Sequence, residues 1–189
     1  MERKLKRMVN DDENISIFNT HGYIISLDPS LNNTGYCVAK ITQQKKQKRV
    51  TIIEVGHIPN GHFESNRMGY KLIHIYRRLT QLKNTYNPFV IIKENLATNG
   101  YGQVESLATV HGIIRMVFRD IQIIGYAPNK IKKDVTGSGK AEKEDIVNSI
   151  QRYIENKYIY TDINLTQFHT TDESDALAVL LTYLLEEKI

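Results

Sequence analysis

The stretch that decides the fold runs Tyr23-Ile24-Ile25-Ser26-Leu27-Asp28-Pro29-Ser30-Leu31-Asn32-Asn33-Thr34-Gly35-Tyr36-Cys37-Val38. A short apolar run ends in one carboxylate, Asp28, and a proline and several turn-forming polar residues follow it. Thr34 to Val38 has the pattern of a second strand, so the chain folds back. An acid at the end of a buried strand suggests a site, although an Asp-Pro pair also caps ordinary turns. The stretch therefore predicts two paired strands with Asp28 inside a sheet and open to solvent.

The size and composition of the chain fit one globular domain. It has 189 residues, 41% of them hydrophobic, and a formal net charge of +4 that suits an anionic partner such as nucleic acid without requiring one. The single cysteine, Cys37, fits a reducing compartment and lies in a predicted strand, which favours a buried side chain over a reactive thiol. The basic N-terminus lacks the apolar stretch of a signal peptide, and no run has the length of a membrane span. We therefore expect a cytoplasmic protein with no membrane contact.

The order of the predicted elements indicates an α/β fold. Residues 1–20 are polar and without period, which predicts a flexible leader before a single domain at 21–189. The predicted strands cover 23–28, 34–41, 50–57, 89–92 and 121–126, with a basic turn at 43–49, and the predicted helices cover 62–84, 104–118, 140–156 and 172–187. Three consecutive strands form an antiparallel meander, whereas strands that alternate with helices pair in parallel. The sequence thus predicts a mixed five-stranded sheet with helices on both faces.

Acidic residues close two strands and open the last helix. Asp28 and Glu94 each follow an apolar strand, and Asp172 and Asp175 lie three residues apart, on one face of the last helix. The residues after them are apolar nearly all round, so this helix is expected to be buried. An acidic N-terminal cap is the ordinary alternative for the two aspartates. Acids on the inner side of a buried helix need a cation, and together with the two strand ends they favour a metal site.

The ligand types decide which metal suits this site. Carboxylates without a cysteine or a close histidine pair form a hard-oxygen set, which fits Mg²⁺, or Mn²⁺ in its place, better than zinc. Such a cluster holds two ions, one activating a water and the other stabilising the leaving oxygen of a phosphodiester. Thr170 with Glu173 matches a capping box, so the last helix is expected to begin there.

Four blocks of this sequence resemble the RuvC-type Holliday junction resolvases, in the order of that family. They are Leu27-Asp28-Pro29-Ser30 with Thr34-Gly35-Tyr36, then Val90-Ile91-Ile92-Lys93-Glu94-Asn95, then Tyr126-Ala127-Pro128 with Ile131 to Lys143, and last Asp172-Glu173-Ser174-Asp175-Ala176-Leu177-Ala178. They span about Tyr23 to Leu185. The resemblance implies a ribonuclease H-like fold, a homodimer, and Mg²⁺-dependent nicking of four-way DNA junctions in recombination and repair. It also implies that Asp28, Glu94, Asp172 and Asp175 are the catalytic, metal-binding carboxylates.

Basic residues surround a glycine-containing turn, Thr136-Gly137-Ser138-Gly139, that is expected to lead into a helix. Backbone N–H groups at such a helix start can take a phosphate while neighbouring lysines neutralise charge, although charge runs are also common on solvated faces. The pattern is not a nucleotide-binding P-loop, because Ala141 follows Lys140 where Ser or Thr is needed. The lysines predicted to bind DNA are Lys132, Lys133, Lys140 and Lys143.

The sequence departs from the bacterial family after Glu94. The next residues are Asn95-Leu96-Ala97, without the phenylalanine that stacks on junction bases in the family, and Tyr101 is the candidate substitute. With the basic turn and the leader, this departure suggests a phage or mobile-element member whose substrates extend to flaps and forks.

Two histidines and one helix have further interpretations. His111 lies on an apolar helix face and is expected in the core, and His169 is either an ordinary loop histidine or an aid to proton transfer or phosphate contact. Helix 104–118, which contains Gly112, fits either a dimer interface or a core helix.

Three functions compete on these residues. The first is a metal-dependent, structure-specific endonuclease for branched DNA, and the second is a ribonuclease H-like enzyme for RNA or RNA–DNA hybrid, since the same carboxylate set serves both. The third is a junction-binding protein with a degenerate site. All the acids are present, which argues against the third, because an inactive binder gains little from clustered negative charge near DNA.

Overall fold

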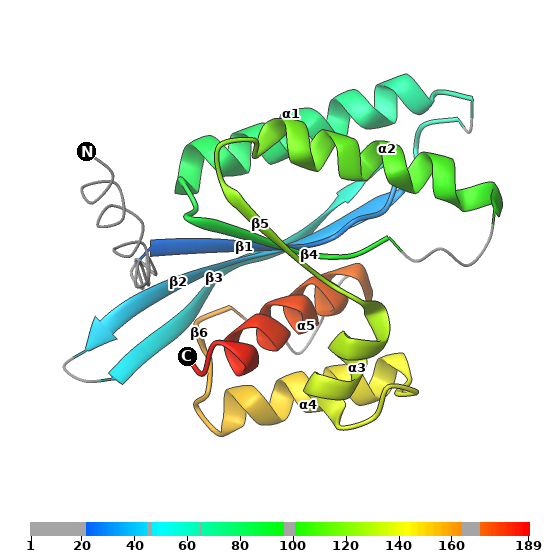
Figure 1. The fold of residues 1–189 in the computed structure, drawn as a ribbon. Coiled ribbons are helices and arrows are strands. Elements are labelled where there is room, and N and C mark those ends of the chain that lie inside the picture. Colours follow the sequence, from blue (N-terminus) through cyan, green and yellow to red (C-terminus); the bar gives the residue numbers. More distant parts are fainter. Residues whose placement is uncertain (1–21, 45–46, 65, 97–100, 164–170) are drawn as a thin grey trace, which may run out of the picture.

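A mixed sheet forms the centre of the molecule, with helices on both faces (Figure 1). The computed structural model describes residues 22–44, 47–64, 66–96, 101–163 and 171–189. The strands are β1 (Gly22–Asp28), β2 (Asn33–Gln44), β3 (Gln47–Pro59), β4 (Val90–Glu94), β5 (Gln122–Tyr126) and β6 (Tyr160–Thr161). The helices are α1 (Met68–Tyr86), α2 (Tyr101–Val117), α3 (Pro128–Thr136), α4 (Lys143–Glu155) and α5 (Thr171–Glu186).

The sheet order is β5-β4-β1-β2-β3-β6. Strands β1, β2 and β3 form the predicted antiparallel meander, and β4 pairs in parallel with both β1 and β5. The sequence predicted five strands, and this count is wrong, because the described sheet has six. The sixth, β6, pairs with β3 through two residues, which is too short a segment to leave a periodic pattern.

The region between β5 and α4 also differs from its prediction. Residues 128–136 form helix α3, and the helix expected from residue 140 begins at Lys143. Pro128 opens α3, and Gly137 ends it with a left-handed φ of 86° and an N–H bond to the Lys133 carbonyl oxygen at 2.8 Å. Gly137 therefore terminates a helix. The expected basic turn at 43–49 is shorter, because β2 reaches Gln44 and β3 starts at Gln47. The predicted leader, residues 1–20, lies outside the described residues.

The helices form two layers on the sheet (Figure 1): α1 and α2 cover one face, and α3, α4 and α5 cover the other. Alternate residues of β1 divide between these layers, with Ile25 and Leu27 packed toward α1 and α2, and Ile24 toward α5. The Ser26 hydroxyl donates to the Ala176 carbonyl oxygen of α5 at 2.7 Å. Asp28, two residues further along β1, therefore lies on the α5 side of the sheet.

Helix α5 is the central core helix, as its apolar sequence predicted. Every residue from Ala176 to Leu184 is buried, so the helix packs with protein on all sides. Cys37 is fully buried under the same layer, and burial raises the pKa of its thiol, which confirms its predicted structural role. Within the described ranges, none of the helices has the length and apolar character of a membrane span.

Candidate active site

The ends of two parallel strands bring Asp28 and Glu94 together. Leu27 of β1 is in register with Lys93 of β4, so the next residue on each strand is the acid. Ile24 and Ser26 on β1 and Val90 and Ile92 on β4 face α5, and the alternation along each strand places both acids on that same face. The carboxyl ends of adjacent parallel strands are thus the floor of the site.

Gly35 brings the start of α5 onto this floor. Gly35 of β2 is the direct partner of Asp28 across the sheet. A Cβ atom at this position would lie 2.0 Å from the carbonyl oxygen of Asp172 and 2.6 Å from its carbonyl carbon. The helix backbone therefore rests directly on a residue without a side chain, beside Asp28. This close approach brings Asp172 and Asp175 to the same site.

The pKa values of the acids report their closeness. The pKa of Asp28 is raised to about 8, mainly by burial and then by the charges of Glu94, Asp175 and Asp172. The pKa of Glu94 is raised to about 7, mainly by burial and then by Asp175. The pKa of Asp175 is raised by burial and by Asp172. The four acids predicted from sequence therefore form one electrostatically coupled cluster, contributed by β1, β4 and α5.

Two lysines lie at this cluster. The Lys143 ammonium of α4 donates to the Thr171 hydroxyl at 2.7 Å and lies 3.7 Å from Asp175 Oδ2. Its charge opposes the upward shift in the pKa of Asp175 and Asp28, and Lys132 of α3 does the same for Glu94. The other two predicted DNA-binding lysines, Lys133 and Lys140, are exposed. The basic run is therefore divided between the carboxylate cluster and the open surface.

The start of α4 does not match the predicted phosphate site. The Glu142 carboxylate accepts the backbone N–H of Asp145, and the Asp145 carboxylate accepts the N–H of Glu142 at 2.9 Å, which completes a capping box. The protein's own acids thus occupy two of the N–H groups at this helix start, and Glu144 adds a further negative charge. Acids at this helix start therefore disfavour the binding of an anion there.

Sequence reasoning missed a polar pair beside the cluster. His57 of β3 is in register with Gly35, and its Nδ1 lies 2.9 Å from Oε1 of Glu173 on α5. The only sequence signal for Glu173 was the capping box with Thr170, and Thr170 lies outside the described residues, as does His169. Nothing in the local pattern around His57 distinguishes it from any other strand residue.

Two other predicted positions have different outcomes. His111 is buried on α2, as predicted, and burial together with Lys93 and Arg115 lowers its pKa to about 4. Tyr101 is the first residue of α2, but its side chain lies outside the described residues.

The donor chemistry of the cluster fits a hard divalent cation. In the described part of the chain, no three His, Cys, Asp or Glu side chains already converge as ligands of one ion. All four clustered groups are nevertheless oxygen donors, and burial with mutual repulsion raises the pKa of Asp28, Glu94 and Asp175. A cation would relieve this cost, and Mg²⁺-type ions prefer such ligands.

A comparison with known families gives a match over most of the chain. The family model described as "Crossover junction endodeoxyribonuclease RuvC" matches residues 24–183, which include all four acids. This chain belongs to the RuvC family. The family consists of metal-dependent nucleases that cut DNA at crossover junctions.

Relatives and solved structures agree with this assignment. The RuvC protein of Prochlorococcus marinus subsp. pastoris is 30% identical over 87% of this chain and 97% of its own length. The RuvC protein of Orientia tsutsugamushi is 31% identical over 88% and 97%. The fold is similar to that of Thermus thermophilus RuvC, solved in complex with a Holliday junction substrate, with a TM-score of 0.70, 15% identity, and coverage of 89% of this chain and 96% of that one. The predicted ribonuclease H-like resolvase fold is confirmed.

Proposed function

We propose that this RuvC-family chain nicks four-way DNA junctions by hydrolysing phosphodiester bonds in the bacterial cytoplasm, including that of a phage-infected cell. The observation that carries the proposal is the coupled cluster of Asp28, Glu94, Asp172 and Asp175, at the carboxyl ends of β1 and β4 and the start of α5. Lys132 and Lys143 lie beside it. The cluster supplies metal ligands, and the lysines supply positive charge for the phosphate backbone. Solved resolvases of this fold include one with a Holliday junction bound.

The four acids have distinct roles in this proposal. Asp28, Glu94 and Asp175 bind metal directly, and Asp172 completes the shell of a second ion. When bound, two Mg²⁺ ions, or Mn²⁺ in their place, activate the attacking water and stabilise the leaving oxygen. The strand ends hold Asp28 and Glu94 in place, because β1 and β4 are each paired on both sides. Asp172 and Asp175 depend instead on where α5 begins.

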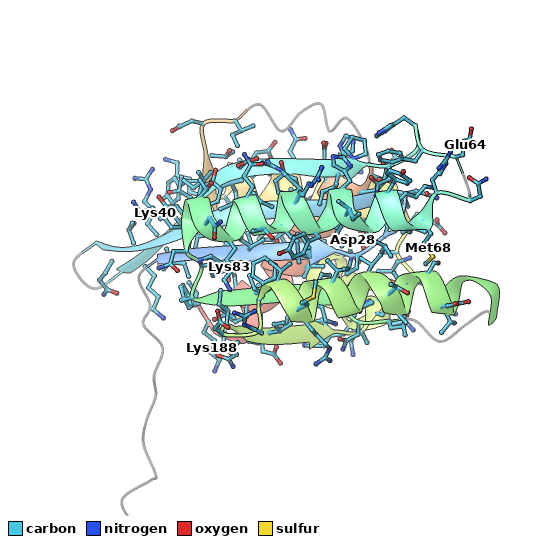
Figure 2. All side chains as sticks on the ribbon, turned by 90° about the horizontal axis from the view of Figure 1, so that it is seen from above. Asp28, Lys40, Glu64, Met68, Lys83 and Lys188 are labelled. Atoms are coloured by element: carbon cyan, nitrogen blue, oxygen red, sulfur yellow. The ribbon has the colours of Figure 1, made fainter. Side chains whose placement is uncertain are left out.

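The exposed lysines Lys133 and Lys140 position DNA without reading its sequence. Replacing either by alanine should reduce the slope of log Kd against log salt for junction binding by about 1, because one phosphate contact is lost. Fluorescence anisotropy at several salt concentrations measures this slope. Lys188→Asn is the matched control, since Lys188 lies away from Asp28 (Figure 2) and Asn tolerates its φ of 52°. Unchanged slopes in both lysine variants would remove them from the DNA interface.

The protein is proposed to act as a homodimer, since a symmetric junction needs two cuts. Helices α1 and α2 carry exposed apolar side chains: Tyr70 (57% exposed) and Ile73 (50%) near the start of α1, and Met116 (50%) near the end of α2. The predicted interface, α2, is one of these helices. Light scattering should give twice the chain mass without DNA, and that mass plus one junction with DNA, and Met116→Lys with Ile73→Lys should halve the mass of the free protein. A wild-type monomer at working concentration in both conditions would contradict the dimer.

A nicking assay over several substrates tests the function. The wild type with Mg²⁺ is given a mobile four-way junction, a flap, linear duplex and an RNA–DNA hybrid, each labelled on one strand at a time and on every strand in turn. Paired, symmetric cuts in the junction are expected, with little cutting of linear duplex. Cuts in the hybrid alone would favour the ribonuclease alternative. Tight junction binding without cutting in Mg²⁺ or Mn²⁺ would leave only a binding protein.

A further inference from the structure

The first turn of α5 carries an unfavourable concentration of negative charge. Asp172 and Asp175 lie at this end of the helix, and the backbone of Asp172 contacts Gly35, the direct partner of Asp28 across the sheet. The position of this turn relative to β1 is set by its contacts with the sheet and with α4. Whatever holds the turn in place therefore decides where two of the four proposed metal ligands lie.

Contacts hold this turn on three sides. Beneath it, the backbone of Asp172 packs directly against Gly35. The Ser26 hydroxyl donates to the Ala176 carbonyl oxygen at 2.7 Å. On the α4 side, Lys143 donates to Thr171 at 2.7 Å. On the β3 side, the contact is between His57 and Glu173, 116 residues apart in sequence.

The His57–Glu173 contact has the features of a specific tether. The Glu173 side chain is 6% exposed, although it is a carboxylate, and the His57 side chain is 22% exposed. A buried carboxylate is costly unless it is hydrogen-bonded, so the contact with His57 helps to hold the Glu173 side chain inward. A carboxylate only accepts hydrogen bonds, and so the Nδ1–H of His57 is the donor, at 2.9 Å.

The register of the sheet explains why this tether acts on the metal ligands. Asp28, Gly35 and His57 are direct partners across β1, β2 and β3. The helix start lies over the middle residue, Gly35. Glu173 is next in sequence to Asp172 and two residues before Asp175, so a bond from β3 to Glu173 restrains both aspartates relative to Asp28.

We propose that His57 and Glu173 are positioning residues, which hold the start of α5 so that Asp172 and Asp175 lie in reach of the same ions as Asp28 and Glu94. This inference rests on the proposed function, because that function makes the four acids metal ligands. The contacts that hold the helix start do not depend on it. Neither residue touches the substrate or the reacting atoms. Each acts through the backbone of the helix.

Mn²⁺ binding measured by electron paramagnetic resonance, without DNA, is the first test. His57→Ala and Glu173→Ala should each weaken Mn²⁺ affinity by about 10-fold, within the range that outer-shell partners of metal ligands typically contribute. The double variant should lose no more than the worse single one, because both changes break one bond. His57→Asn keeps an N–H donor near Nδ1, and Glu173→Gln keeps an acceptor, so both should recover most of the affinity.

Single-turnover nicking of a junction and thermal unfolding complete the experiment. The two alanine variants should nick about 10- to 100-fold more slowly, with unchanged junction Kd in EDTA, at a temperature where both are folded. The control is Asp120→Ala, which breaks an ion pair of the same 2.9 Å length with Lys83, a residue well away from Asp28 (Figure 2). It should leave Mn²⁺ affinity and nicking unchanged.

The outcomes separate the tether from the function. Wild-type Mn²⁺ affinity in both alanine variants, or a double variant whose losses multiply, would overturn the tether. A lower melting temperature without loss of Mn²⁺ affinity would also overturn it, since that is a purely structural role. If the wild type nicks no junction while the variants still lose Mn²⁺, the proposed function fails and the tether stands.

Discussion

Asp28→Asn should abolish junction nicking and at the same time make the metal-free protein more stable. The amide keeps the shape of the side chain but removes a charge that the ions need, and losing several kcal/mol of transition-state stabilisation lowers the rate by about 10³-fold or more. Stability should rise because Asp28 is destabilising when charged: burial and three neighbouring acids raise its pKa to about 8. Nicking on a labelled junction and melting temperature in EDTA measure the two effects.

The gain in stability should depend on pH in a defined direction. In the unfolded chain, Asp28 loses its proton near its ordinary pKa of 3.8, whereas in the folded protein it holds the proton up to about 8. The contribution of Asp28 to the stability of the wild type is therefore largest below pH 4, and it is lost as the pH rises toward 8. The amide of the Asp28→Asn variant does not titrate. The difference in unfolding free energy should grow over this range to a few kcal/mol, or about 5 °C or more in melting temperature at pH 8.

Two results would contradict this account of Asp28. Nicking at the wild-type rate would show that Asp28 is not needed as a metal ligand. A melting-temperature difference that stays constant from about pH 5 to about pH 9 would show that Asp28 is not held protonated by its neighbours. Added Mg²⁺ should stabilise the wild type more than Asp28→Asn, because only the wild type has the full set of charges to neutralise.

Gly35→Ala should reduce nicking by about 10²-fold or more, although Gly35 carries no functional group. The new methyl carbon would lie 2.0 Å from the Asp172 carbonyl oxygen, and the contacted atoms are backbone, so α5 itself must move. A displacement of about 1 Å in a catalytic group is enough for a loss of this size. The overlap should also destabilise the fold by about 1–3 kcal/mol. Single-turnover nicking, well below the melting temperature, checks the prediction.

A matched glycine separates this effect from a general cost of alanine. Gly69, in the first turn of α1, has no atom within 4 Å of an added Cβ, so Gly69→Ala should nick like the wild type. The junction Kd of Gly35→Ala in EDTA should be unchanged, because its lysines are untouched. Nicking by Gly35→Ala at the rate of Gly69→Ala would show that α5 need not rest on β2.

The acids and the strands were predictable because their signals are local. Each predicted strand and each long helix leaves a pattern of apolar residues within its own segment, as the run before Asp28 and the turn after it show. Helix α3 was missed because it has nine residues, with Ile131 and Val135 as its buried side chains, which is too little for a helical period. Strand β6 was missed for the same reason.

The family, the meander, and the four acids at strand ends and a helix start could all be read from the order of residues along the chain. How these acids meet depends on the folded arrangement. The close contact of Gly35 with Asp172, the approach of Lys143 to Asp175, and the bond between His57 and Glu173 all join residues far apart in the chain. Such contacts depend on how closely α5 packs on the sheet. The spacing of apolar residues along the chain does not predict that distance. The sequence shows which groups are present, and packing decides which of them act together.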